Sequence, residues 1–301
     1  MPENFLLTLP PLMLAYIHWN IAPEAFTVFG IPVRYYGLLF VGGFIAAFQF
    51  LEWLYKREKI PYQKLSQLAT YAIIGSFAGA RLGHCLFYEP DYFLYHPLEM
   101  LLPIGYDEDG KMIFQAYTGL ASHGGAFGIL LALLVYKWRT KEDLLPLLDR
   151  IAIATPLACG FIRMANFFNS EIIGYPTDVP WAIVFEQVDM EPRHPAQLYE
   201  AVFYFSLFVV MFLLYKRKGL STSLVAMSIV KEESTQKIKT GFYFALCIIS
   251  IFTFRFLVEF IKERQVGFEE NLPIDMGQIL SIPFVVLGVW ILIKENKSKQ
   301  I

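Results

Sequence analysis

The sequence has little charge. Lys, Arg, Asp and Glu make up 17% of its 301 residues, against roughly 25% in soluble domains, whereas hydrophobic residues make up 56%. Basic and acidic residues nearly balance at a net charge of −2, so no overall positive field favours nucleic acid as a partner. This composition excludes an ordinary soluble domain and predicts a chain that lies mostly within a membrane.

Cysteine is also scarce. Cys85, Cys159 and Cys247 lie far apart within apolar runs and form no Cys-x-x-Cys spacing, a pattern typical of buried free thiols. No nucleotide-binding loop is recognisable either, so we expect no metal and no cofactor. The N-terminal stretch MPENFLLTLPPLML lacks Lys and Arg before its apolar residues, so we expect no cleaved signal peptide.

What the sequence does have is long apolar stretches. A helix needs about 20 mostly apolar residues to cross the hydrocarbon core of a bilayer. Seven segments meet this requirement and are predicted to be transmembrane helices: 35–54, 67–88, 119–138, 147–168, 196–215, 241–261 and 277–293. The fold is therefore predicted to be an all-α polytopic membrane protein, with residues 1–301 forming a single integral membrane domain.

The basic residues fall on alternate loops of this seven-span chain. Most of the 25 Lys and Arg residues cluster at 56–64, 137–150, 216–239 and 294–299, all on one side. Cationic loops stay in the cytoplasm, so the N-terminus is predicted to lie outside and the C-terminus in the cytoplasm. The two long outer segments, 89–118 and 170–195, are rich in aromatic residues and are expected to lie in the membrane interface.

Charged residues within predicted spans are the main functional signal, because each costs at least about 2.5–3.5 kcal/mol at membrane depth. The stretch GFIRMANFFNSEIIG (160–174) ends the fourth span. Arg163, Asn166 and Ser170 fall within an arc of about 60° on one helix face, and Glu171 follows them. Such a cluster suits a lipid phosphate. The alternative is a snorkelling arginine beside a helix cap, which needs fewer polar residues than are present.

Two further motifs carry polar residues at membrane depth. In GLASHGGAFG (119–128), His123 precedes two glycines that allow another backbone or a lipid headgroup to approach closely; a packing histidine is the alternative. In the sixth span, Arg255 and Glu259 are four residues apart on one helix face, so an ion pair between them is expected. Arg255 would then serve with Arg163 as a second cation for a phosphate.

Two more motifs favour a structural and a functional role about equally. Arg81 lies in GARLGHCLFY, on a span whose glycines are spaced for close helix packing. Arg193 and His194 begin RHPAQLYEA (193–201), after which Gln197 and Glu200 are predicted to face inward. Anchoring and substrate positioning remain open for both motifs.

Taken together, the motifs resemble those of the bacterial prolipoprotein diacylglyceryl transferase family. The family signature, approximately G-R-x-[GA]-N-F-x-N-x-E-x-x-G, is similar to IRMANFFNSEIIG. Further similar segments follow the family's order from about residue 33 to residue 284: VRYYGLLFVGGFIA, RLGHCLFY, SHGGAFG, RHPAQLYE, FRFLVEF and MGQILSIP. The chain departs from the family at Ile162 and Ser170, where glycine is usual, and at Ile251, where tyrosine is usual.

The resemblance implies an activity. The enzyme would transfer the diacylglyceryl group of phosphatidylglycerol to the lipobox cysteine of a prolipoprotein signal peptide, forming a thioether and releasing glycerol phosphate. It would work in the bacterial cytoplasmic (inner) membrane, with its active site toward the outer leaflet and membrane lipids around it. Catalytic roles are implied for His123, Arg163 and Arg255, with Arg163 also binding the lipid phosphate. Substrate binding is implied for Tyr36, Asn166, Glu171, Arg81, Glu259, Arg193 and His194.

Two other functions are compatible with membrane-embedded arginines. A phospholipid or anion transporter would continue its polar residues to the cytoplasmic side and often contains inverted repeats. The cytoplasmic halves of the first, third and seventh spans are apolar, and no repeat is visible. Another lipid-headgroup transferase would share the arginines but not the whole ordered set of motifs.

Overall fold

The computed structural model describes residues 16–102, 104–106, 111–114, 119–220, 239–263 and 274–297. The chain forms two compact units: the first comprises Met1–Phe50 with Leu148–Ile301, and the second comprises Leu51–Leu147. Helices α1 (Tyr35–Arg57) and α6 (Leu144–Phe168) each contribute to both units. The predominance of helix agrees with the prediction from the sequence.

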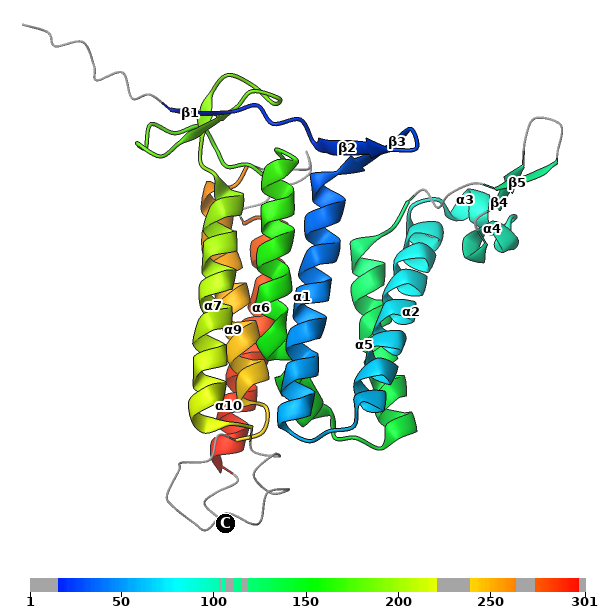
Figure 1. Ribbon diagram of the computed structural model, residues 1–301, viewed down its shortest axis with the longest axis vertical. Coiled ribbons are helices and arrows are strands. Elements are labelled where there is room, and N and C mark those ends of the chain that lie inside the picture. The colour runs from blue at the N-terminus through cyan, green and yellow to red at the C-terminus, as the bar shows by residue number, and fades with distance from the viewer. Residues whose placement is uncertain are drawn as a thin grey trace, which may run out of the picture. The chain divides into compact units, whose positions relative to one another are not determined.

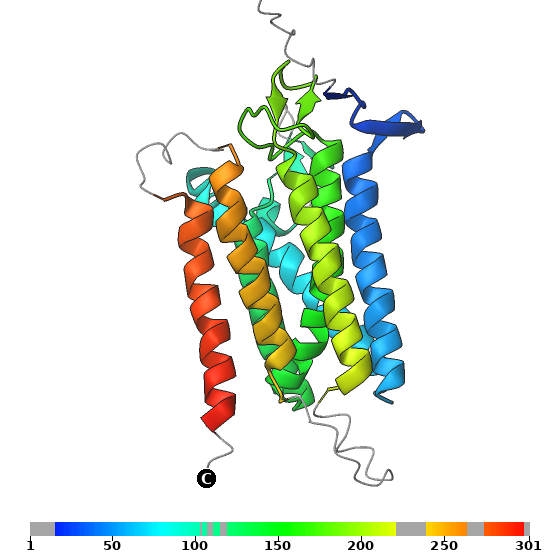
Figure 2. The ribbon, with the colours of Figure 1, turned by 90° about the vertical axis from the view of Figure 1, so that its left-hand side faces the viewer.

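The first unit is built on long apolar helices. Besides α1 and α6 these are α7 (Ala196–Lys218), α9 (Phe242–Val258) with the short 3₁₀ turn η1 (Glu259–Ile261), and α10 (Met276–Lys297), which run side by side in Figures 1 and 2. Aromatic rings join neighbouring helices. Phe203 of α7 stacks on Phe254 of α9 with ring centroids 4.0 Å apart, and Phe252 of α9 stacks on Phe284 of α10 at 4.2 Å. These contacts join α7 to α9 and α9 to α10.

Helix α9 begins under a cap that α6 supplies. The Asp149 carboxylate, 1% exposed, accepts hydrogen bonds from the backbone N–H of Gly241 at 2.6 Å and of Phe244 at 2.8 Å. The first N–H groups of a helix have no partner within the helix, and a carboxylate at this end also complements the helix dipole. Asp149 therefore ties the start of α9 to α6.

Short strands lie at the other end of α6 and α7 (Figure 1). Strands β1 (Ile17–Trp19), β6 (Ile183–Phe185) and β7 (Pro192–Arg193) form a sheet in the order β1-β6-β7, with β1 parallel and β7 antiparallel to β6. Strands β2 (Glu24–Val28) and β3 (Ile31–Arg34) form an antiparallel hairpin before α1. The sequence predicts helices only, so these strands correct the purely helical prediction.

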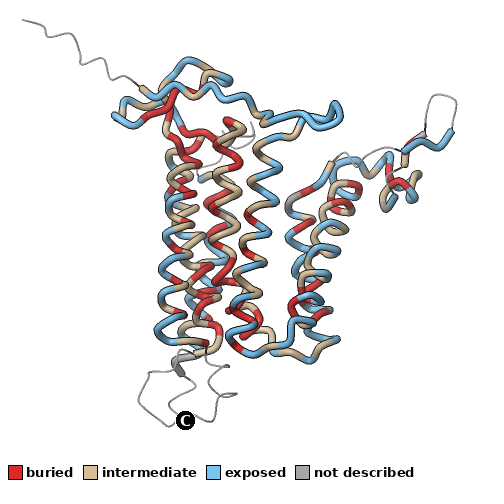
Figure 3. The backbone as a smooth tube through the Cα atoms, viewed as in Figure 1, coloured by how far each residue is buried: buried red, intermediate tan, exposed pale blue. Residues whose placement is uncertain are grey.

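The sheet covers a small apolar core at the end of α6. Phe167, Ile173, Ile183 and Phe185 are buried together there, with Trp19 packed against them. Figure 3 shows the buried chain around this point. The segment that follows α6 is thus anchored to the helix by apolar contacts.

The second unit centres on a close helix pair. Helices α2 (Tyr62–Phe87) and α5 (Ser122–Thr140) lie side by side, accompanied by α3 (Pro90–Phe93), α4 (Pro97–Leu101) and the hairpin strands β4 (Ile104–Tyr106) and β5 (Met112–Phe114). A Cβ added at Gly75 would lie 2.6 Å from the Gly128 carbonyl oxygen, and one at Gly83 would lie 2.8 Å from the Gly124 Cα. The close helix packing predicted from the α2 glycines is confirmed.

Each of the seven predicted spans is helical, with ends shifted by a few residues. The third, for example, begins at Ser122 rather than at residue 119. Five helical segments are long and apolar enough to cross a membrane: α1, α6, α7, Phe242–Ile261 and Met276–Lys294. Helices α2 and α5 are also long enough to cross a membrane, but they are less apolar than these five segments. The described chain is that of a multi-pass membrane protein.

Candidate functional site

The polar cluster at the end of α6 is built on a helix cap. The N–H of Ser170 donates to the carbonyl of Phe167 at 3.0 Å, and the N–H of Glu171 donates to that of Asn166 at 3.1 Å. Ser170 has a φ of +50°. These two bonds and the left-handed residue define a Schellman motif, in which Ser170 occupies the position that glycine usually takes. The cap turns the chain so that Glu171 faces back toward α6.

Side-chain hydrogen bonds connect this cap to Arg163. The guanidinium Nη1 of Arg163 donates to Asn166 Oδ1 at 3.1 Å, and Asn166 Nδ2 donates to Glu171 Oε1 at 2.6 Å. Asn169 Nδ2 donates to Glu171 Oε2 at 3.2 Å, and Gln197 Nε2 donates to the Glu171 carbonyl at 2.7 Å. The structure therefore brings together three predicted site residues, Arg163, Asn166 and Glu171, in one network.

A carboxylate from α7 completes the surroundings of Arg163. Glu200 Oε2 lies 3.2 Å from Arg163 Nε, and the Glu200 side chain is 0% exposed. Tyr204, one turn further along α7, donates its hydroxyl to Glu200 Oε1 at 3.3 Å. Sequence reasoning predicts that Glu200 and Gln197 face inward, which both do, but it does not pair Glu200 with Arg163.

Two other predicted residues lie near this network. Tyr36, in the first turn of α1, is within electrostatic range of Arg163 and Glu171. Arg255 of α9 is within electrostatic range of Tyr204. The Arg255 guanidinium forms no hydrogen bond or ion pair with any residue that the structure describes. We refer to Tyr36, Arg163, Asn166, Glu171, Glu200, Tyr204 and Arg255 as the arginine cluster.

The expected ion pair between Arg255 and Glu259 is wrong. Helix α9 ends at Val258 and Glu259 begins the η1 turn, but the Glu259 N–H still donates to the Arg255 carbonyl and its backbone keeps helical dihedral angles, so the two residues lie on successive turns without pairing. Glu259 instead pairs with Lys262, whose Nζ lies 3.1 Å from Glu259 Oε2. Both side chains are largely buried, so this pair neutralises two charges at the end of the helix.

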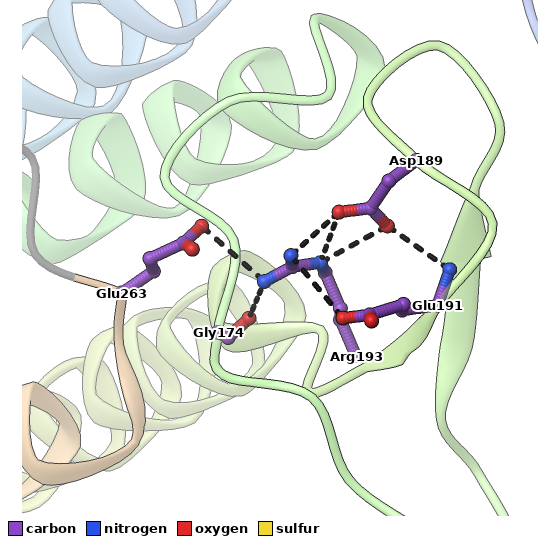
Figure 4. A network of polar contacts seen from close by, with 5 residues as sticks. All are labelled: Gly174, Asp189, Glu191, Arg193 and Glu263. Carbon is purple, nitrogen blue, oxygen red and sulfur yellow. Dashed lines mark hydrogen bonds and ion pairs between the residues drawn. The ribbon is translucent and has the colours of Figure 1, made fainter.

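Arg193 is engaged by acidic residues around it (Figure 4). Its Nε donates to Asp189 Oδ2 at 2.9 Å, its Nη1 lies 3.3 Å from Glu263 Oε2 and donates to the Gly174 carbonyl, and Glu191 lies 3.7 Å away. The Arg193 guanidinium holds the pKa of the Asp189 carboxyl below its usual range. Of the two roles left open for Arg193, this geometry favours the anchoring of the 174–193 segment to the end of η1.

His194 also has a structural environment. Its Nδ1 lies 3.1 Å from the Tyr199 hydroxyl, and its backbone N–H and C=O bond to Tyr175 and Gly174. Burial lowers the pKa of the His194 imidazole, which favours the neutral ring at neutral pH. A neutral histidine is a weaker partner for a phosphate than a charged one.

The remaining predicted residues, Arg81 and His123, belong to the second unit. Arg81 is buried, donates to the carbonyls of Glu99 at 2.8 Å and Met100 at 3.3 Å, and lies over the Phe93 ring at 4.7 Å. These contacts favour the anchoring role for Arg81. His123 is exposed in the first turn of α5 and forms no hydrogen bond with the described part of the chain.

The described residues contain no group of three His, Cys, Asp or Glu side chains that could hold a metal ion. The three cysteines are free, with Cys85 and Cys247 buried and Cys159 half-buried, as their apolar surroundings predict. The arginine cluster itself consists of guanidinium, amide, phenol and carboxylate groups. This set can bind an anion and stabilise negative charge.

Comparison with known proteins identifies the family. The sequence model of prolipoprotein diacylglyceryl transferase matches residues 23–294, which include the whole arginine cluster. The chain belongs to the prolipoprotein diacylglyceryl transferase family.

Relatives in this family match nearly the whole chain. The phosphatidylglycerol–prolipoprotein diacylglyceryl transferase of Bacteroides fragilis is 48% identical over 289 residues, which cover 96% of this chain and 99% of the relative. The proteins of the same name from Chloroherpeton thalassium and Porphyromonas gingivalis are 39% and 35% identical, and the matches cover 95% and 97% of this chain and 97% and 98% of the relatives.

The departures from the transferase signature differ in their structural consequences. At Ser170 the left-handed backbone gives a physical reason for the glycine that the family usually carries, and the buried Ser170 hydroxyl has no hydrogen-bond partner among the described residues. Ile251 lies one turn before Arg255 in α9, so it removes a hydroxyl from the neighbourhood of that arginine. Nothing in the structure explains Ile162.

Proposed function

We propose that this chain transfers the diacylglyceryl group of phosphatidylglycerol to the lipobox cysteine of prolipoprotein signal peptides. The observation that carries the proposal is the arginine cluster, whose Arg163, Asn166 and Glu171 lie in the segment that is similar to the signature of the family. Arg163 is oriented by Asn166 and Glu200, and Arg255 offers a second guanidinium nearby. Such an arrangement suits a phosphodiester in a lipid environment.

The reaction is a displacement at the glyceryl carbon. The cysteine sulfur forms a C–S bond while the C–O bond to the phosphate breaks, and glycerol phosphate leaves with the electron pair. Negative charge grows on the phosphate oxygens, where the guanidinium groups of Arg163 and Arg255 stabilise it. Tyr36, Asn166 and Glu171 position the headgroup or brace the arginines.

The thiol must lose its proton, since the thiolate is the nucleophile and a free cysteine has a pKa of about 8.5. In this proposal His123 either accepts that proton or donates to the phosphate. His123 is exposed and has no hydrogen bond within the described chain, so its imidazole is accessible to a substrate. No cofactor is needed, because the sulfur, the carbon and the leaving phosphate all belong to the substrates.

The proposed topology follows from the distribution of charge. Lys56 and Arg57 lie in the last turn of α1, Lys137 and Arg139 in that of α5, and Lys216–Lys218 in that of α7. Cationic helix ends face the cytoplasm. With all seven long helices spanning the inner membrane, the N-terminus lies outside, the C-terminus lies in the cytoplasm, and the arginine cluster faces the outer leaflet.

A reconstituted assay tests the proposal. Purified protein in detergent is incubated with phosphatidylglycerol and a lipobox peptide, and the peptide is analysed by mass spectrometry. The expected result is a mass gain of one diacylglyceryl group on the cysteine, with glycerol phosphate released in equal amount. A peptide with serine in place of the cysteine is the matched control. Absence of any mass gain on the cysteine peptide contradicts the proposal.

A further inference from the structure

Glu200 is predicted from the sequence to face inward, in a motif for which anchoring and substrate positioning remain open, and the sequence assigns it no individual role. Its carboxylate is 0% exposed, lies 3.2 Å from Arg163 Nε and accepts the Tyr204 hydroxyl at 3.3 Å. A buried carboxylate is costly to desolvate unless an opposite charge and hydrogen bonds compensate it. Its place between Arg163 and Tyr204 supplies both, so Glu200 is an integral part of the arginine cluster.

Glu200 contributes one of two constraints on the Arg163 guanidinium. The Glu200 carboxylate lies beside the Nε edge as an ion pair, its Oε2 without a hydrogen bond among the described residues, and Asn166 accepts a hydrogen bond from Nη1. Asn166 is itself fixed by Glu171, whose carbonyl accepts a bond from Gln197 of α7. Because the guanidinium is planar, two contacts on different edges determine its orientation.

The two arginines of the cluster differ in whether a carboxylate neutralises them. Arg163 and Glu200 form a pair with no net charge. Arg255 has no carboxylate partner among the residues that the structure describes, and its positive charge is uncompensated there. A phosphodiester anion is therefore attracted mainly by Arg255, whereas Arg163 offers oriented N–H donors.

We propose that Glu200 is a positioning residue for the transfer reaction. It holds Arg163 in the orientation that meets the charge developing on the leaving phosphate, and its own negative charge weakens the binding of the ground-state lipid. This inference rests on the proposed function. It predicts that Glu200 raises the turnover rate while it also raises the KM for phosphatidylglycerol.

The substitution Glu200→Gln separates these effects. Glutamine keeps the shape and one acceptor oxygen but removes the charge. We expect kcat to fall roughly 10- to 100-fold, less than the cost of about 100- to 1,000-fold for removing an oriented donor, because the donors of Arg163 remain and lose only their orientation. We expect the KM for phosphatidylglycerol to fall several-fold because Arg163 is no longer neutralised. Glu200→Asp keeps the charge, so its KM should stay near that of the unchanged protein while kcat falls.

Tyr204→Phe is the matched control. It removes the hydroxyl that donates a hydrogen bond to Glu200 and that also interacts with Arg163, but it leaves the ion pair between Glu200 and Arg163 in place. We expect its kcat to fall less than in Glu200→Gln, with KM unchanged. The unfolding midpoint in detergent is measured for each variant, so that a loss of folded enzyme is seen directly.

The outcomes are distinguishable. If the unchanged protein gives no lipidated peptide, the proposed function is refuted. If it is active and Glu200→Gln lowers kcat with KM unchanged or raised, or keeps kcat near the original value, the positioning role alone is refuted. If Glu200→Gln does not fold, Glu200→Asp and Tyr204→Phe carry the test, and a kcat in both that equals the original overturns the inference.

Discussion

Replacing Ser170 with glycine should stabilise the protein. Ser170 has a φ of +50°, and an L-residue in the left-handed region costs roughly 1–2 kcal/mol. Its buried hydroxyl has no partner among the described residues, which adds a cost of about 1–3 kcal/mol. Glycine removes both costs but has more freedom in the unfolded chain, an opposing effect of about 0.4–1 kcal/mol. Taking the low end of each cost, we expect a gain of about 1–2 kcal/mol.

Thermal unfolding in detergent at a fixed scan rate measures this gain. For a chain of 301 residues, 1–2 kcal/mol corresponds to a rise in the unfolding midpoint of about 2–3 °C. Ser170→Ala is the matched control, because it removes the hydroxyl but keeps the left-handed strain, and its midpoint should rise by less. A midpoint for Ser170→Gly that is unchanged or lower refutes the strain at this cap.

Three further predictions concern packing, pH and the lipid-facing chemistry. Asp149→Ala removes the acceptor of two N–H groups at the start of α9 and should lower the free energy of unfolding by about 2–3 kcal/mol, measured as a lower midpoint, with Asp149→Asn less affected. Arg193 lowers the pKa of the Asp189 carboxyl in the folded protein. Their contact therefore stabilises the 174–193 segment fully at pH values above the unfolded pKa of about 3.9, and this stabilisation is lost as the pH falls through the lower folded pKa. Proteolysis of that segment by an acid-active protease should therefore increase on acidification, and Asp189→Asn should be cleaved readily at every pH. Arg255→Lys should raise the KM for phosphatidylglycerol in the peptide assay, since a lysine keeps the charge but lacks the planar donor set; an unchanged KM argues against a role for Arg255 in holding the phosphate.

The helices could be predicted from the sequence because each is a long apolar stretch, and a stretch of about 20 apolar residues has the length of a membrane-spanning helix. Their ends shift in both directions. Helix α2 begins at Tyr62, before the predicted start at residue 67, because polar residues can continue a helix beyond its apolar part, whereas α5 begins at Ser122, after the predicted start at residue 119. The strands escaped prediction for a different reason. Each strand has only two to five residues, too few for a clear alternating pattern. Strand β1 also pairs with β6, which is more than 160 residues away in the sequence, so a local pattern cannot predict the sheet.

In the site, too, contacts within one helix could be predicted from the sequence, whereas contacts between helices could not. Arg163 and Asn166 could be placed on one face because their spacing in a helix fixes it, and the bond between them forms. The Arg163–Glu200 pair depends on how α6 and α7 are rotated against each other, where Gly160 faces the Phe205 ring. The predicted pair between Arg255 and Glu259 was wrong because Glu259 pairs with Lys262 instead, which the spacing of Arg255 and Glu259 does not reveal.

The most direct test of the account is the rate of peptide lipidation by Arg163→Lys. Lysine keeps the positive charge but cannot contact Glu200 and Asn166 on two edges while offering further donors to a phosphate. The account predicts that thioether formation, followed by mass spectrometry with phosphatidylglycerol and the lipobox peptide, is abolished or nearly so in a protein that still folds in the membrane. A lysine variant that lipidates the peptide at nearly the original rate contradicts it.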